Sequence, residues 1–133
     1  MSRSLEIPIE DLASARIAGL HADRLEVCED LDTDGWSPSA ERLALIVEGV
    51  SGFDLEVVAL IRPRCCPNFT VSSAAVSQAR VDIEASSRAG ADGVVLGFLN
   101  QRRHVDPDSS EELAELAHSL GLEVHAGHGL TYD

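Results

Sequence analysis

The sequence contains no lysine: all ten of its basic side chains are arginine. This absence excludes chemistry that needs a lysine amine, namely a Schiff-base mechanism and the phosphate-binding lysine of a P-loop. Basic residues are also outnumbered by 23 acidic ones, so the formal net charge of the 133-residue chain is −13. Nucleic-acid binding needs a basic surface, and we therefore expect no nucleic-acid partner.

Long apolar runs and cysteines are also scarce. A membrane-spanning helix needs about 18 apolar residues in a row, and no such run occurs. The N-terminal stretch "MSRSLEIPIEDL" lacks the apolar core of a signal peptide, so we expect a cytoplasmic protein with no membrane partner. Three cysteines cannot all pair within one chain, and a cytoplasmic compartment would keep them reduced.

Short apolar runs alternate with helix-length segments along the whole chain. This alternation predicts an α/β fold with parallel strands in the order 1-2-3-4-5. The expected strands cover 4–10, 23–29, 55–63, 93–100 and 122–127. The expected helices cover 11–20, 40–50, 72–90 and 108–121, with Asp11 and Ser39 as the caps of the first two.

A weak internal repeat supports this prediction, because "AGLHADRLEVC" at 18–28 is echoed by "RAGADGVVLG" at 88–97. A TIM barrel needs eight βα units and about 250 residues. This chain holds four units plus a fifth strand. The sequence therefore predicts a single domain over 1–133 that forms part of a TIM-like barrel.

Several segments, in the same order, resemble the copper homeostasis protein CutC family. They are "ADRLEVCEDLDTDGWSPS" at 22–39, "IRPR" at 61–64 followed by Phe69, and "AGADGVVLGFL" at 89–99 with "HVD" at 104–106. The resemblance implies a TIM barrel of about twice this length and a cytosolic protein linked to copper homeostasis. Two departures affect the expected metal site: Pro8 stands where the family usually has cysteine, and Cys65-Cys66 replaces a Gly-Gly pair.

Arg62 and Arg64 follow the third apolar run, and ligands of parallel sheets bind at the ends of the strands. A guanidinium group binds phosphate or carboxylate in a bidentate manner, so this pair predicts an anion site. The alternative is that Arg62 pairs internally with Glu26 or Glu6, since buried charges need partners. Strand alternation puts these three side chains on one face, and we expect one polar patch at the strand ends.

The fifth strand and its loop, "LEVHAGHGL", offer further polar groups. His125, with Glu6 and Glu26, is a candidate for acid–base catalysis. The backbone amides of Gly127 and Gly129 could complete an anion cradle.

The candidate metal ligands are soft side chains, because thiolates suit Cu(I) and imidazole suits copper or zinc. They are Cys28, Cys65, Cys66 and His128. For Cys28 the alternative is a small buried apolar residue. The two adjacent cysteines direct their sulfur atoms apart in an extended loop, so we expect no tight preformed copper site.

Two functions therefore stay open: a copper-linked binding protein, and a TIM-barrel-type enzyme or binding protein for a small anionic metabolite. A part of a barrel also leaves open strand edges and an apolar inner face, which favour association. We expect a homodimer or a higher oligomer. Its interface would bury the apolar side chains Val58, Leu60, Val94, Leu96 and Phe98.

Overall fold

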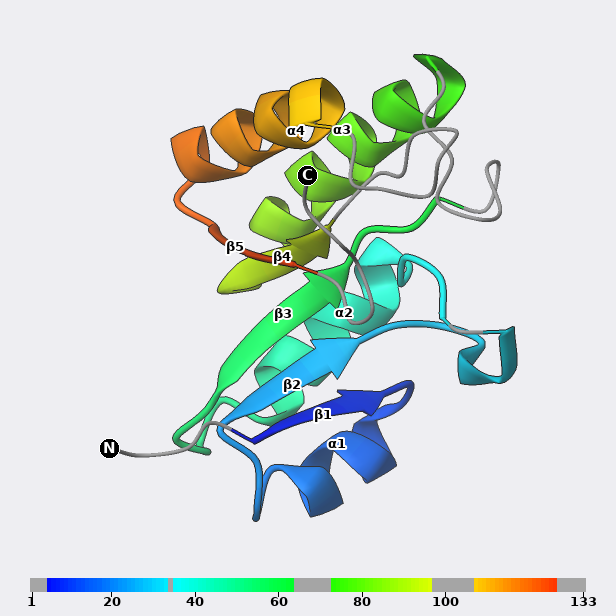
Figure 1. The fold of residues 1–133 in the computed structure, drawn as a ribbon. Helices are drawn as coiled ribbons and strands as arrows, with labels where there is room; N and C mark the ends of the chain where they lie inside the picture. Colours follow the sequence, from blue (N-terminus) through cyan, green and yellow to red (C-terminus); the bar gives the residue numbers. More distant parts are fainter. Residues whose placement is uncertain (1–4, 34, 64–72, 97–106, 127–133) are drawn as a thin grey trace.

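In the part of the chain that the structure describes, five parallel strands form a sheet with helices between them (Figure 1). A computed structural model describes residues 5–33, 35–63, 73–96 and 107–126. The sheet has the order β1-β2-β3-β4-β5 and every pair of neighbours is parallel, as predicted. The strands are β1 (Glu6–Ile9), β2 (Arg24–Val27), β3 (Glu56–Leu60), β4 (Gly93–Leu96) and β5 (Glu123–Ala126).

Four helices connect these strands. They are α1 (Leu12–Ala18), α2 (Ala40–Gly49), α3 (Ser73–Arg88) and α4 (Pro107–Ser119). Both predicted caps are confirmed: the Asp11 carboxylate accepts from the Ser14 amide at 2.7 Å, and the Ser39 hydroxyl accepts from the Arg42 amide at 3.2 Å. Each cap satisfies an amide that the first helical turn leaves unpaired.

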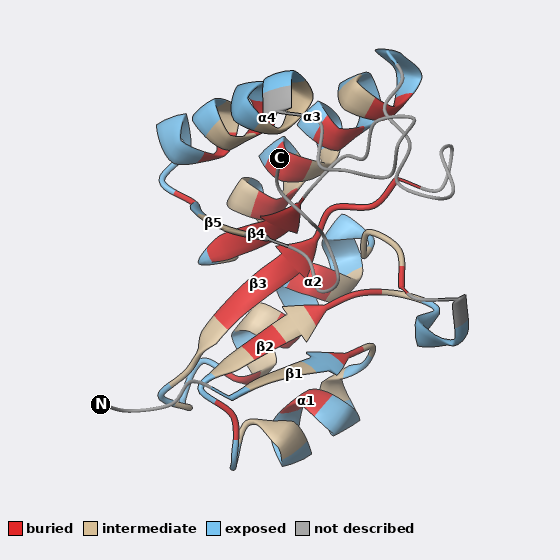
Figure 2. Cartoon of the chain, viewed as in Figure 1, coloured by how far each residue is buried: buried red, intermediate tan, exposed pale blue. Residues whose placement is uncertain are grey.

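All four helices pack against the same face of the sheet, here called the outer face. Alternate strand residues such as Leu25, Val27 and Val57 form one apolar cluster with α1 and α2. A second cluster joins Val94 and Leu96 to α3 and α4. β3 and β4 are buried along almost their whole length (Figure 2). The opposite, inner face carries the side chains that alternate with these.

The internal repeat corresponds to a repeated hydrogen-bond pattern at the strand starts. The Asp23 carboxylate accepts from the Leu5 amide at 2.8 Å, and the Asp92 carboxylate accepts from the Val57 amide at the same distance. The amide of each aspartate also donates back to the same residue, through the carbonyl of Leu5 or Val57. Each repeated Ala-Asp thus joins its strand to the strand before it.

Two expectations need correction. Val94 and Leu96 were expected on the inner face, but they point to the helices, while Val95 points inward. The stretch between β2 and α2 falls outside the expected helices and strands, but it holds a short 3₁₀ helix, η1 (Leu31–Thr33). The predicted strands also extend past the observed ones by one to three residues at several ends. None of the helices in the described part of the chain is long and apolar enough to cross a membrane.

Candidate functional site

A row of charged side chains crosses the inner face of the sheet near the strand starts. At its centre, Arg24 Nη1 lies 3.2 Å from Glu6 Oε2, and Arg24 Nη2 lies 3.5 Å from Glu56 Oε1. The register explains these pairs, because Arg24 is aligned with Glu6 on one side and with Glu56 on the other. The guanidinium therefore links β1, β2 and β3.

Glu26 extends this row toward the strand ends. It lies two residues after Arg24 on the same face and hydrogen-bonds to the carboxyl group of Glu6. Burial raises the pKa of Glu26 to about 7, and the hydrogen bond and charge of Glu6 contribute to the rise. Two carboxyl groups in contact cannot both be ionised without repulsion, so this pair retains a proton near neutral pH.

On the other side of Arg24, the row continues across β4 to β5. Glu56 hydrogen-bonds to Glu123, which raises the pKa of Glu56, and Glu123 Oε2 lies 3.8 Å from His125 Nε2. β4 lies between these strands and presents Gly93 at the crossing. A Cβ atom at this position would lie 2.7 Å from the Glu123 carbonyl oxygen. The missing side chain is what lets β5 lie this close to β4 at Glu123.

We call this set the charged row. Its members, in the order in which they contact one another, are Glu26, Glu6, Arg24, Glu56, Glu123 and His125.

Arg62 lies apart from the charged row, beyond the end of β3. Its Nη1 donates to the Gly35 carbonyl oxygen at 2.8 Å, and its guanidinium carbon lies 4.2 Å from the centre of the Trp36 ring. Its amide donates to the Ser37 hydroxyl at 2.7 Å. Arg62 is only 7% exposed. Three consecutive loop residues thus fix both its backbone and its side chain.

The loop that contacts Arg62 is itself tied to the end of β2. Glu29 and Trp36 exchange backbone hydrogen bonds of 3.0 and 2.8 Å in an antiparallel bridge. Gly35 has a φ of 86°, which strongly favours glycine, and a Cβ there would lie 3.1 Å from Leu60 Cδ2. The loop therefore covers the strand ends closely only because this residue is glycine.

The predicted polar patch is thus divided into two parts. Glu6 and Glu26 are together, but Glu6 is the first residue of β1 and lies at the strand start, contrary to expectation. Arg62 comes four residues after Val58, the register partner of Glu26, which is about 13 Å along the strand. Cys28 and Leu60 occupy the inner face between the two levels.

Cys28 is the one candidate metal ligand within the described residues. Its side chain is fully buried, and its thiol donates to the Ile9 carbonyl oxygen at 3.6 Å. Burial raises the pKa of Cys28 to about 12, and neighbouring carboxylates add to the rise. Such a thiol stays protonated, whereas metals bind the thiolate.

The other predicted ligands lie outside the described residues. They are Arg64, Cys65, Cys66, Gly127, His128 and Gly129. Among the residues that the structure describes, no group of three or more His, Cys, Asp or Glu side chains is arranged to hold a metal ion.

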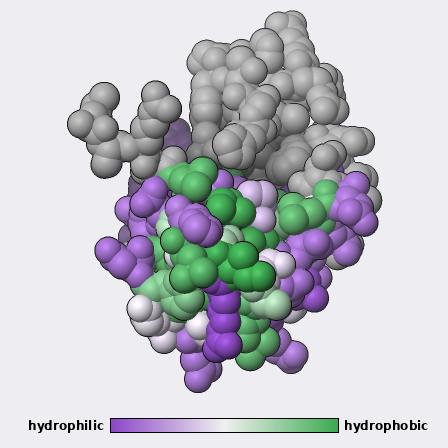
Figure 3. Space-filling view, turned by 90° about the horizontal axis from the view of Figure 1, so that it is seen from below, coloured by the Kyte–Doolittle hydropathy of each residue, from purple (hydrophilic) through white to green (hydrophobic). Residues whose placement is uncertain are grey.

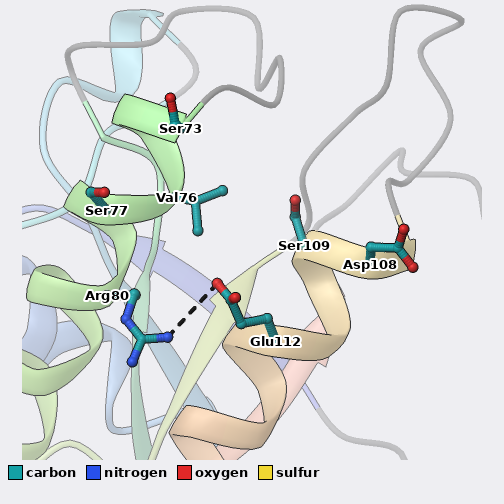
Figure 4. Close-up of a pocket in the computed structure, with 7 residues that line it drawn as sticks. All are labelled: Ser73, Val76, Ser77, Arg80, Asp108, Ser109 and Glu112. Atoms are coloured by element: carbon teal, nitrogen blue, oxygen red, sulfur yellow. Dashed lines mark ion pairs between the residues drawn. The ribbon is translucent and has the colours of Figure 1, made fainter.

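A groove of about 570 Å³ lies between α3 and α4 on the helical side of the sheet (Figure 4). Arg80 Nη1 and Glu112 Oε2 lie 3.7 Å apart in it, and both side chains are about half exposed. The remaining lining residues are Ser73, Val76, Ser77, Asp108 and Ser109. The groove contains no predicted site residue, and its arginine faces a carboxylate, so we assign it no ligand.

Sequence reasoning missed the residues that hold Arg62. Trp36 and Ser37 lie in an irregular loop, where no periodicity indicates which way a side chain points. It also missed Glu56, although alternation with Val58 and Leu60 places this residue on the inner face. That signal was available from the sequence.

Similarity to known proteins identifies the family of this chain. A model of the CutC family matches residues 4–133. The chain belongs to the CutC family. CutC proteins from Xanthomonas axonopodis pv. citri and Photobacterium profundum are each 36% identical to it, over 130 and 126 residues.

Solved structures agree with this assignment. A structure from Streptococcus agalactiae, named as a putative copper homeostasis protein CutC, has a TM-score of 0.81 and 25% identity over 93% of this chain. A D-psicose 3-epimerase, at 15% identity and a TM-score of 0.59, shares the fold alone. These likenesses confirm the α/β fold as part of a TIM-like barrel.

This CutC-family chain spans about half the length of the curated relatives it matches. The match covers 97% of this chain but 52% of the Xanthomonas protein, and 94% against 50% for the Photobacterium protein. It covers 59% of the solved Streptococcus chain. The activity of a full-length family member is therefore a matter of proposal for this chain.

Proposed function

We propose that this CutC-family chain binds a small anionic molecule, carrying a phosphate or carboxylate group, with Arg62 as the binding residue. The observation that carries the proposal is the fixed position of Arg62 at the carboxyl end of the sheet. Its guanidinium is held by the Gly35 carbonyl and the face of Trp36. Parallel α/β sheets bind ligands at this end, and a guanidinium held in one orientation binds an anion at little cost in entropy.

The proposal concerns ligand binding alone and includes no chemical reaction. Glu6, Glu26 and His125 remain the acid–base candidates, but Glu26 is about 13 Å from the level of Arg62 along the strand. A catalytic carboxyl group has to reach a bound ligand within hydrogen-bond distance. We therefore assign the anion to Arg62 and attach no chemical step to the charged row.

Ligand binding can be followed by the fluorescence of Trp36, because it is the only tryptophan in the chain and it contacts Arg62. Titration with inorganic phosphate, and separately with succinate, should give a saturable change in Trp36 fluorescence for at least one of them. Arg62→Gln should abolish the change. Arg80→Gln removes an equal charge from the α3–α4 groove and should leave it intact.

Replacement of the buried Arg62 can also unfold the chain, so a second variant is needed. Arg62→Lys keeps the charge but loses the planar pair of donors, and it should weaken binding while circular dichroism shows a folded chain. Binding of equal strength in Arg62→Lys and Arg62→Gln would contradict the proposal, as would a wild-type titration with no change.

A link to copper homeostasis is the second candidate, and the name of the Streptococcus relative favours it. The described residues support copper less well than an anion, because the thiol of Cys28 is buried with a pKa raised to about 12. A Cu(I) titration against a competing chelator separates the candidates. We expect no tight binding; stoichiometric binding that disappears in a Cys65→Ser, Cys66→Ser double variant would favour copper.

A further inference from the structure

A carboxylate on α3 contacts the loop that holds Arg62. Asp82 is half-buried, and it accepts hydrogen bonds from the Ser37 hydroxyl and from Gln78 Nε2, the latter at 3.0 Å. Burial raises the pKa of Asp82, and these two hydrogen bonds oppose the rise. Burying a carboxylate costs free energy, so its position needs a compensating contact.

Ser37 connects this carboxylate to the end of β3. Its hydroxyl oxygen accepts from the Arg62 amide at 2.7 Å, and its own amide donates to the Arg62 carbonyl oxygen at 3.0 Å. A hydroxyl group has one proton to give. Since Asp82 takes that proton, an oxygen lone pair of Ser37 is directed at the Arg62 amide. The hydrogen bonds thus run without interruption from α3 through the loop to Arg62.

The contact between Ser37 and Asp82 lies at the border of a pocket, so close packing surrounds it on one side only. A pocket of about 350 Å³ opens beside it, and its lining includes Ser37, Pro63 and Asp82. Side chains that border a pocket lack the close neighbours that would otherwise fix them. The hydrogen bond between Ser37 and Asp82 is therefore a contact that sets the loop against α3.

We propose that Asp82 is a positioning residue for Arg62: through Ser37 it fixes the loop that carries Trp36 and so orients the guanidinium for an anionic ligand. The ligand part of this inference rests on the function proposed above. The positional part does not, because it concerns the contact between Arg62 and Trp36 in the free protein.

Trp36 fluorescence tests the two parts separately. Asp82→Ala should shift the Trp36 emission maximum to longer wavelength, because the loop loses its contact with α3. It should also raise the dissociation constant for inorganic phosphate about five-fold, the effect of one lost hydrogen bond. Asp82→Asn keeps an oxygen acceptor for Ser37. In this variant the emission maximum and the dissociation constant should both stay close to the wild-type values.

Glu84→Ala is the matched control, since it removes an exposed carboxylate from the same helix. It should change neither the emission maximum nor the phosphate affinity. If Asp82→Ala leaves the emission maximum unchanged, or shifts it no differently from Asp82→Asn, Asp82 does not position the loop. If the emission shifts as expected but wild type binds neither anion, the positioning stands and the proposed function fails.

Discussion

Glu26 is the residue whose environment has the clearest consequence for stability. Its pKa in the folded chain is about 7, above the ordinary value of 4.5, mainly because it is buried. The folded state therefore binds more protons than the unfolded state between these values, and stability falls as the pH rises through this window. We expect a loss of about 3 kcal/mol in the free energy of unfolding between pH 4.5 and 7.5.

Glu26→Gln separates this effect from general acid sensitivity. The amide keeps a hydrogen bond to Glu6 but cannot ionise, so the variant should lose less stability over that range and be more stable than wild type at about pH 8. Urea unfolding at several pH values measures both. Glu84→Gln, at an exposed site of α3, should retain the wild-type slope. An equal slope in Glu26→Gln and wild type would show that Glu26 ionises freely in the folded chain.

At the residue scale, the sequence predicts which face a side chain occupies better than which partner it meets. Strand alternation puts Glu26 on the inner face, as the structure does. Alternation does not say that Arg62 lies about four residues further along the strand direction than Glu26. It also does not say that a loop residue such as Trp36 covers Arg62. Those facts depend on loop conformation, which is set by contacts between residues distant in the sequence.

The elements were more predictable than the site. Strand order follows from the alternation of strands and helices, and the caps Asp11 and Ser39 follow from their side-chain chemistry. Strand ends were less accurate, because apolar residues such as Ile61 continue the pattern after the strand itself has stopped. Hydrophobicity reports burial, and burial extends beyond the hydrogen-bonded ladder.

Gly93 in β4 provides the prediction at this scale. Gly93→Ala would put a Cβ atom 2.7 Å from the Glu123 carbonyl oxygen and 3.0 Å from the Glu123 Cβ, so β5 has to shift. We expect a loss of roughly 1–3 kcal/mol in the free energy of unfolding, measured with urea. Gly52→Ala meets nothing within 4 Å and is the control. A Gly93→Ala chain as stable as Gly52→Ala would mean that β5 is not held closely against β4.

For the whole molecule, the observed burial changes the reason for expecting a homodimer. Val58 and Leu60 face inward as predicted, but both are already buried within a single chain, and Phe98 lies outside the described residues. Three exposed apolar side chains lie instead on α1, just after it and next to β1, at the end of the molecule that Figure 3 faces. They are Ile17 at 68%, Leu20 at 71% and Leu5 at 48% exposed.

We therefore move the proposed dimer interface to the edge formed by β1 and α1. Within the described sheet β1 pairs only with β2, so its other side offers backbone groups to another strand, and a two-fold axis there would bring Ile17 and Leu20 of both copies together. Sedimentation at micromolar concentration should show a dimer that an Ile17→Glu, Leu20→Glu double variant converts to monomer. Leu45→Glu, on the exposed side of α2, should leave the dimer intact. A wild-type chain that sediments as a folded monomer would show that this apolar edge is stable in water and that the homodimer proposal is wrong.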